Sequence, residues 1–328
     1  MKRKMSFGYT VVAIFLMFAI NGFTGLRDGH AQQTEKFPSR PIEFVVPWGP
    51  GGGADQVARK SASLMEPLLG VSIPVINAPG ASGQTGLMKM LTQPTDGYQI
   101  QVMTGDTYSL IGSGTIKIKP NDFVPLAIMI QQPSGFFIKQ DSPWKTWADV
   151  EKAAKTKVLK VAITGFDSPD DITVNYFASK GLKFLAVPYA KPGERFTSIL
   201  GNHADLLYEQ AGDVRSFVDS HQIRPVIFFS DKKFSVYPNI PVSKELGYEV
   251  TLPQFRVVII KAGTDPKRVK LLADALGKVA ASAPFKQYLK EQYAEENSYV
   301  SFLDAQKYME GWMAEAKRWL AATAEKKK

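Results

Sequence analysis

The stretch Pro47-Trp48-Gly49-Pro50-Gly51-Gly52-Gly53-Ala54-Asp55 determines how the rest of this chain is interpreted. It follows an apolar run at residues 42–46 and precedes a helical pattern that begins at Gln56. A strand, a glycine turn and a helix start in this order form an anion-binding site, because the first helical N–H groups have no intrahelical partner and the helix dipole is positive there. Glycine also lets a ligand approach the backbone closely.

The same arrangement recurs at Ala78-Pro79-Gly80-Ala81-Ser82-Gly83, between a strand-like run at 71–77 and a helix-like run at 84–91. Two such turns predict one small anionic ligand that is held largely by backbone groups. The alternative is that the glycines only turn the chain between a strand and a helix. Neither turn matches a phosphate-binding G-x-x-x-x-G-K sequence, and neither fits a dinucleotide-binding G-x-G-x-x-G sequence in register.

The first 31 residues have the features of a secretory signal peptide. Lys2, Arg3 and Lys4 form a positive start, residues 11–20 are apolar, and Gly29-His30-Ala31 offers small residues to a signal peptidase. We therefore predict cleavage near Ala31 and a periplasmic location. A membrane anchor is the alternative, although so short an apolar run does not cross a bilayer core of about 30 Å.

Composition excludes several classes of protein. The chain of 328 residues has no cysteine, so disulfides, thiolate metal sites and lipoprotein attachment are excluded. The formal charge of +9 is scattered rather than gathered in a basic stripe with aromatic residues, so nucleic acid is not an expected partner. A modest positive balance fits the attraction of anionic small molecules. Residues 32–328 are enough for two domains.

Short β-rich runs alternate with helical patterns along most of the chain, which is typical of an α/β protein. Thr146 is expected to cap a helix with Asp149 at its third position, and Asp265 followed by Pro266 is a strong helix start. The predicted strands are 42–46, 98–104, 123–130, 134–138, 158–164, 184–188 and 223–229. One stripe of the last helix is expected to pack in the core, namely Tyr308, Trp312, Ala316 and Trp319.

The residues that an enzyme would need do not form a recognisable set. After the predicted signal peptide only His203 and His221 remain, and neither has a metal-type partner nearby in the sequence. No nucleophile appears with its base, and adjacent carboxylates such as Asp170-Asp171 normally face different ways. We therefore expect a binding protein with no catalytic residue, no metal and no cofactor.

Several short motifs follow one another over most of the chain. They lie at residues 38–59, 77–86, 96–98, 187–189, 200–205, 237–247 and 262–266, and the first two contain the glycine turns. In order and spacing these motifs resemble those of the extracytoplasmic solute-binding proteins of tripartite tricarboxylate transporters, the Bug family. The ordered series is far more specific than any one of its members.

The resemblance implies a type II periplasmic-binding-protein fold of the Venus flytrap kind. Each of two α/β domains would have a mixed sheet flanked by helices, and the ligand would lie in the cleft between the domains. Domain 1 would comprise residues 32–130 and 250–328, and domain 2 would comprise residues 131–249. Binding in the cleft would favour a closed state that a membrane transporter recognises.

The resemblance also implies which residues of domain 1 contact a ligand carboxylate. Residues 104–107, at the end of the predicted strand 98–104, would add hydroxyl and N–H groups. Asp55 is expected to cap its helix, since a carboxylate there would repel an anion. The implied contacts are Trp48 as a wall, the backbone of Gly51, Gly52, Gly53 and Ala54, the backbone of Gly80, Ala81, Ser82 and Gly83, and Thr104, Asp106 and Thr107.

Domain 2 departs from the family pattern at residues 164–171, where Asp167 and Asp171 replace a usual glycine and histidine. Ser168 is kept, and could bind the ligand while starting a helix. One hypothesis is that Asp167 or Asp171 faces the cleft and accepts hydrogen bonds from the ligand; the other is that both only cap the helix. Gln210 and Asp213 are further candidates, in a run that family members use as a cleft-lining turn.

The favoured interpretation is therefore a monomeric exported protein that captures a small organic acid. Its partners would be that carboxylate ligand and the membrane subunits of a tripartite tricarboxylate transporter. A second interpretation keeps the scaffold but assigns it an amino acid, an amide or an aromatic acid as ligand. A third is a periplasmic enzyme or sensor subunit on the same scaffold. The lack of catalytic residues counts against the enzyme, whereas the sequence does not test a sensor role.

Overall fold

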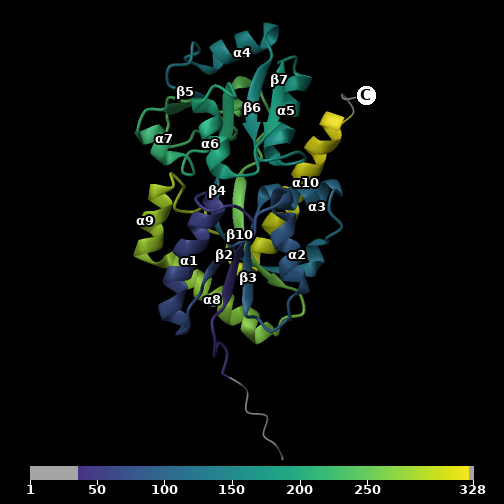
Figure 1. Ribbon diagram of the computed structural model, residues 1–328, viewed down its shortest axis with the longest axis vertical. Coiled ribbons are helices and arrows are strands. Elements are labelled where there is room, and N and C mark those ends of the chain that lie inside the picture. Colours follow the sequence, from purple (N-terminus) through teal and green to yellow (C-terminus); the bar gives the residue numbers. More distant parts are fainter. Residues whose placement is uncertain (1–35, 325–328) are drawn as a thin grey trace, which may run out of the picture. The chain divides into compact units, whose positions relative to one another are not determined.

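Two five-stranded mixed sheets of the same design organise the protein (Figure 1). The computed structural model describes residues 36–324. The strand order is β2-β1-β3-β10-β4 in one sheet and β7-β6-β8-β5-β9 in the other. We call each sheet with its helices a lobe, lobe 1 for the first sheet and lobe 2 for the second. Both sheets belong to one packed unit that begins at Phe37.

In lobe 1, β1 runs parallel to β2 and β3, whereas β10 is antiparallel to β3 and β4. The central strands are rich in apolar and β-branched residues, as expected for a sheet covered by helices on both faces. The strands are β1 (Glu43–Val46), β2 (Val75–Asn77), β3 (Gln99–Thr104), β4 (Phe123–Gln132) and β10 (Gln254–Lys261). The helices are α1 (Gly53–Leu69), η1 (Ala81–Gly83), α2 (Gln84–Thr92), α3 (Gly105–Ser113), η2 (Pro120–Asp122), α8 (Pro266–Ala281) and α9 (Ala283–Glu291).

Lobe 2 repeats this plan, with β6 parallel to β7 and β8 and with β5 antiparallel to β8 and β9. Its strands are β5 (Ser134–Lys139), β6 (Leu159–Ile163), β7 (Phe184–Pro188), β8 (Leu206–Gln210) and β9 (Ile223–Phe228). Its helices are α4 (Trp147–Thr156), α5 (Pro169–Ser179), α6 (Pro192–Leu200), α7 (Arg215–Asp219) and η3 (Lys244–Leu246).

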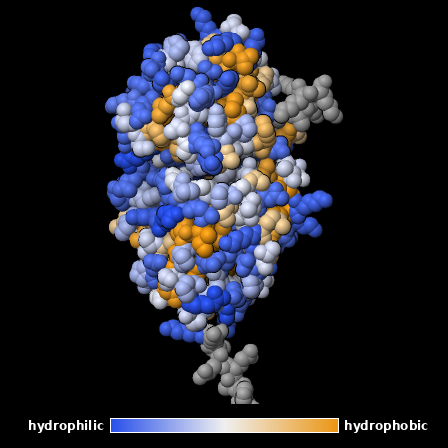
Figure 2. Space-filling view, in the orientation of Figure 1, coloured by the Kyte–Doolittle hydropathy of each residue, from blue (hydrophilic) through white to orange (hydrophobic). Residues whose placement is uncertain are grey.

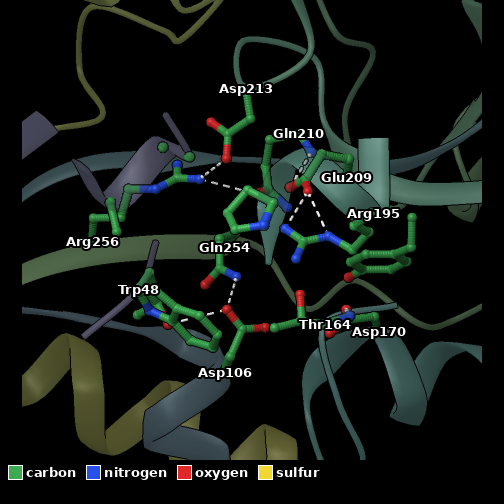
Figure 3. A pocket seen from close by; sticks show the side chains of 16 residues that line it. Trp48, Asp106, Thr164, Asp170, Arg195, Glu209, Gln210, Asp213, Gln254 and Arg256 are labelled. Atoms are coloured by element: carbon green, nitrogen blue, oxygen red, sulfur yellow. Dashed lines mark hydrogen bonds and ion pairs between the residues drawn. The ribbon is translucent and has the colours of Figure 1, made fainter. Parts of the chain in front are cut away.

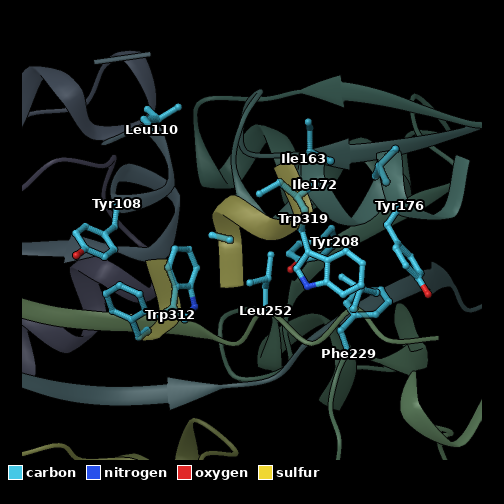
Figure 4. Close-up of a cluster of buried hydrophobic side chains, with 14 of the residues drawn as sticks. Tyr108, Leu110, Ile163, Ile172, Tyr176, Tyr208, Phe229, Leu252, Trp312 and Trp319 are labelled. Atoms are coloured by element: carbon cyan, nitrogen blue, oxygen red, sulfur yellow. The ribbon is translucent and has the colours of Figure 1, made fainter. Parts of the chain in front are cut away.

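The chain passes from lobe 1 to lobe 2 between β4 and β5, and it returns between β9 and β10. The last helix, α10 (Phe302–Ala324), packs on α3 and β4 of lobe 1 and on α5 of lobe 2 (Figure 1). Its Trp312 ring lies 5.2 Å from that of Phe255 in lobe 1, and its Trp319 ring lies 5.1 Å from that of Tyr176 in lobe 2 (Figure 4). The predicted stripe on this helix is thus confirmed as core packing that joins the two lobes.

The surface in Figure 2 is mostly polar, and its hydrophobic side chains form separate patches rather than one continuous band. This is typical of a globular protein whose strands bury their apolar side chains. Among the described residues, no helix is both long and apolar enough to cross a membrane. The predicted signal peptide lies outside the described residues.

Most of the strands and helix starts predicted from the sequence are confirmed. Thr146 caps α4 with Asp149 in a capping box, and Asp265 caps α8 ahead of Pro266. The first helix begins at Gly53, earlier than the predicted Gln56, so the last glycine of the turn is already helical. The proposed turn around Gln210 is wrong in part, because β8 continues through this residue.

Candidate functional site

The first residues of three helices line a cavity between the two lobes, and Figure 3 shows the side chains around it. Helices α1 and α3 follow β1 and β3 of lobe 1, and α5 follows β6 of lobe 2. The ends of parallel strands are where α/β sheets bind ligands. The cavity is lined by Trp48, Gly52, Gly53, Ala54, Thr104, Asp106, Thr164, Asp170, Pro192, Arg195, Tyr208, Glu209, Gln210, Asp213, Gln254 and Arg256.

The cavity is small, with a volume of about 30 Å³. A single water needs roughly 10–15 Å³ on this measure, so there is room for about two waters. An organic acid does not fit between the side chains in this arrangement. Entry of a solute therefore requires that the lobes separate or that side chains of the cavity move.

An ion pair crosses this cavity from one lobe to the other. The Arg256 guanidinium on β10 donates to the carboxylate of Asp213, which follows β8, at 2.5 Å. Arg256 also donates to the side-chain oxygens of Gln210 (2.9 Å) and Gln132 (2.5 Å). Both charged side chains of the pair are nearly excluded from solvent, at 4% and 5% exposure. The pair therefore links the two lobes directly in this closed arrangement.

Asp213 lies against the first glycine turn. A Cβ atom at Gly53 would overlap with both the Asp213 carboxylate and the Arg256 guanidinium, so any larger residue would require this ion pair to move. Burial raises the pKa of Asp213, while Arg256, Arg195 and the backbone N–H of Gly53 oppose that rise. The protein thus places a carboxylate of its own at the N-terminus of α1, which is where the glycine turn predicts an anion.

A second buried pair lies within lobe 2. Arg195 on α6 donates to one Glu209 oxygen through two nitrogens, at 2.7 and 3.1 Å. The other Glu209 oxygen accepts from the backbone N–H of Gln210 at 3.2 Å, and Arg195 donates to the Tyr189 carbonyl at 3.2 Å. Burial raises the pKa of Glu209 to about 7, although Arg195 acts in the opposite direction.

Two more carboxyl groups face the cavity from the two lobes. Asp106, in the first turn of α3, accepts from Thr104 Oγ1 at 3.0 Å and from Gln254 Nε2 at 2.7 Å. Asp170, in the first turn of α5, accepts from the Thr164 N–H at 2.5 Å. Burial raises the pKa of Asp106 to about 8, and the negative charge of Asp170 adds to the rise.

About half of the residues predicted as ligand contacts line this cavity. They are Trp48, Gly52, Gly53, Ala54, Thr104, Asp106, Gln210 and Asp213. The others lie outside its lining, namely Gly51, Gly80, Ala81, Ser82, Gly83, Thr107, Asp167, Ser168 and Asp171. Whether either group contacts the ligand stays a prediction.

The second glycine turn folds into the short helix η1, whose backbone is largely hydrogen-bonded within the protein. Gly83 N–H donates to the Gly80 carbonyl at 3.0 Å, and Thr107 Oγ1 donates to the Ser82 carbonyl at 3.0 Å. The Ser82 side chain lies against Gly165 of lobe 2. In this closed arrangement the turn makes a contact between the lobes.

The helix start at Ser168 is held by local capping bonds. Ser168 is fully buried, donates to the Gly165 carbonyl at 2.5 Å and accepts from the Asp171 N–H at 3.4 Å. Asp171 accepts from the Asp167 N–H at 3.1 Å. Asp167 accepts from Thr115 Oγ1 of lobe 1 at 2.7 Å. Asp171 therefore has a capping role, while Asp167 lies at the boundary between the lobes.

Asp55 also makes local bonds. Its carboxylate accepts from the Gly51 N–H at 3.0 Å and pairs with Arg59, and Asn77 donates to it at 3.0 Å. Burial acts to raise its pKa, but Arg59, Gly51 and Asn77 together hold the pKa below its usual value. Asp55 thus fixes the glycine turn from outside the cavity lining.

Sequence reasoning missed Asp170, Arg195, Glu209, Gln254 and Arg256 as residues of this cavity. Arg256 had a detectable signal, because it is a charge inside the apolar strand β10 and buried charges need a partner. Asp170 was noted only as one of two adjacent carboxylates. In the described part of the chain, no group of three or more His, Cys, Asp or Glu side chains could hold a metal ion.

The family model of the tripartite tricarboxylate transporter family receptor matches residues 57–326. The chain belongs to this family. Among curated proteins, it is 27% identical to the protein BugT of Bordetella pertussis, with 73% of this chain and 76% of BugT covered.

Two solved structures of similar proteins cover nearly all of the described residues. One is a solute-binding protein of the family from Polaromonas, with 25% identity, a TM-score of 0.66 and coverage of 88% of this chain and 100% of that one. The other is an R. palustris protein solved with adipate, with 21% identity, a TM-score of 0.82 and coverage of 88% and 99%. The fold is therefore that of the family's solute-binding proteins, which are not enzymes.

Proposed function

We propose that this protein is an exported solute-binding protein that captures a small carboxylate between its two lobes. It then delivers this solute to the membrane subunits of a tripartite tricarboxylate-type transporter. The observation that carries the proposal is the convergence of the N-termini of α1, α3 and α5 on one cavity between the lobes. Helix N-termini attract anions, and the family's solute-binding proteins supply the context.

The solute would enter when the lobes move apart about the β4–β5 and β9–β10 connections, near the predicted domain boundaries at residues 130 and 250. Trp48 and the start of α1 would contact it from lobe 1, and Gln210 from lobe 2. The R. palustris relative was solved with adipate, which supports a carboxylate as the class of solute. Because ligand binding favours the closed state only by its differential affinity, the solute would have to contact both lobes.

Thermal unfolding of residues 32–328 with a panel of carboxylates tests this function. A solute that binds only the folded state raises the melting temperature, and the rise grows with the ratio of its concentration to its dissociation constant. We expect at least one mono- or dicarboxylate to stabilise the protein at millimolar concentration and to be retained in native mass spectrometry. If no carboxylate stabilises it, the proposed function is wrong.

A further inference from the structure

The cavity between the lobes contains more negative than positive groups. Four carboxyl groups line it, from Asp106, Asp170, Glu209 and Asp213, but only two guanidinium groups, from Arg195 and Arg256. The pairs Arg195–Glu209 and Arg256–Asp213 use both arginines. Asp106 and Asp170 therefore form no ion pair with a residue of the lining, although the Arg195 charge acts on both of them from a distance. A purely anionic solute would place further negative charge beside two carboxyl groups that have no ion pair.

Five buried side-chain atoms of this lining lack a hydrogen-bond partner among the described residues, namely Trp48 Nε1, Asp170 Oδ1, Tyr208 Oη, Asp213 Oδ1 and Arg256 Nε. Two of them, on Asp170 and Trp48, are not on the Arg256–Asp213 pair and lie at helix or strand ends of the cavity. Asp170 is 1% exposed, and its Oδ1 atom accepts no hydrogen bond from any residue between 36 and 324. Trp48 is 6% exposed, and its Nε1 atom has no acceptor within the same described range. Buried polar atoms without partners are costly, so both indicate groups that a solute would supply. One of these groups is a donor for Asp170, and the other is an acceptor for Trp48.

The carboxyl groups are arranged on two sides of the cavity. Figure 3 shows Asp213 and Arg256 on one side, and Asp106 with Asp170 and Thr164 on the other. The first side has a cation and the N-terminus of α1, which suit a carboxylate. The second side has acidic oxygens from both lobes, which suit a cationic donor.

We propose that the solute carries an ammonium group as well as a carboxylate, so that its class is the amino acids and related amino-carboxylates. The ammonium group binds between Asp106 of lobe 1 and Asp170 of lobe 2. The carboxylate of the same solute binds at the α1 N-terminus and Arg256, where it takes the place of Asp213. This inference rests on the proposed function, since it specifies the solute of the same cavity.

The raised pKa of Asp106, at about 8, is consistent with this arrangement. Burial and the Asp170 carboxylate together keep a proton on Asp106 near neutral pH. An ammonium group in the same place supplies the positive charge and lets Asp106 ionise. The solute thus replaces a proton that the cavity otherwise holds.

Calorimetric titration of residues 32–328 with matched pairs of solutes tests the inference. The pairs differ only in an amino group, as do aspartate and succinate, glutamate and glutarate, or 2-aminoadipate and adipate. We expect the amino member of at least one pair to bind about tenfold or more tightly than its partner, as for a charge-assisted hydrogen bond in a buried site. Plain acids that bind as tightly as their amino counterparts in every pair would overturn the inference but leave the proposed function intact.

The variant Asp170→Asn locates the ammonium group. It keeps the size of the side chain and should reduce the affinity for the amino member about tenfold, while the affinity for the plain acid stays unchanged or improves. Asp141→Asn is the control, because Asp141 is an exposed residue of the same lobe that does not line the cavity. Equal losses for both members of a pair would contradict the placement. Absence of binding by all six solutes would count against the proposed function itself.

Discussion

At the scale of single residues, the cavity concentrates ionisable groups that would each be costly to bury alone. Burial and like charge act on Asp106 in the same direction, and the protein responds by keeping it protonated. Glu209 and Asp213 are buried with a guanidinium partner each, which limits that cost. The number of protons bound by the cavity residues therefore depends on pH in the range where the protein would work.

The raised pKa of Asp106 predicts how stability depends on pH. A carboxyl group with a pKa of about 8 in the folded state and 3.8 otherwise binds a proton more tightly when folded. Its stabilising contribution is complete below about pH 4 and is lost as pH rises to about 8. We expect the urea concentration at which half of the protein is unfolded to decrease as pH rises from about 5 to about 8.5. The decrease should be smaller in Asp106→Asn. Titration of Glu209 leaves part of the pH dependence of stability in that variant. If the pH dependence is the same in the variant and the wild-type protein, Asp106 titrates normally.

Gly53 provides a steric test of the ion pair. In Gly53→Ala the new Cβ overlaps with Asp213 and Arg256, so we expect a loss of about 1–3 kcal/mol in the free energy of unfolding. Gly193→Ala is the matched control, since no atom lies within 4 Å of its Cβ position and the change should be nearly neutral. Urea denaturation measures both. Equal stability of the two variants would mean that Asp213 does not occupy the turn.

Part of this site could be predicted from the sequence. The other residues could not, for physical reasons. The glycine turn at Gly52 and Gly53 was recognisable because its residues are local and their chemistry is general. The partners of that turn were not, since Arg256 and Asp213 reach it from segments far apart in the sequence. Only the folded chain brings Asp106 and Asp170 into one cavity, and the raised pKa of Asp106 depends on burial and on that proximity.

At the scale of secondary structure, helix starts were the most predictable feature. Thr146 and Asp265 make their capping bonds with neighbours a few residues away, so local sequence is sufficient. β8 was missed as a strand because its final residues, Tyr208, Glu209 and Gln210, are polar. Those residues are buried in the cavity lining, and burial of this kind has no periodic signal in the sequence.

Helix α10 predicts a stabilising substitution. Gly311 is exposed in the interior of this helix, and nothing lies within 4 Å of its Cβ position. Gly311→Ala should raise the free energy of unfolding by about 0.5–1 kcal/mol, because glycine loses more backbone entropy than alanine in a helix. Gly112→Ala in α3 is a useful contrast, since its Cβ would overlap with Met313. A similar gain in both variants would contradict the reason given.

At the scale of the whole protein, helix α10 and the β4–β5 and β9–β10 connections join the lobes on one side of the cavity. Side-chain contacts between the lobes close the cavity elsewhere. The apolar core is continuous from Tyr108 and Trp312 to Trp319 and Tyr176 (Figure 4). The closing contacts are polar instead, such as Arg256–Asp213 and Thr115–Asp167. Polar contacts are more readily exchanged for water than an apolar core, so we expect the lobes to part on the cavity side.

A disulfide across the lobes can test this motion, because the chain has no cysteine of its own. A Cβ at Gly165 of lobe 2 would lie 3.7 Å from the Cβ of Ser82 in lobe 1. Disulfides join Cβ atoms about 3.5–4.5 Å apart, so Ser82→Cys with Gly165→Cys should form one in the closed state. The reduced double variant is the control for the two substitutions themselves.

The most direct test of capture between the lobes is a calorimetric titration of this double variant, oxidised and reduced, with the carboxylate that stabilises the wild-type protein most. The cavity has a volume of about 30 Å³ when closed, so we predict no measurable binding to the oxidised protein. Reduction of the disulfide should restore binding. Equal affinity in the two states would contradict the account, because the solute would then bind without separation of the lobes.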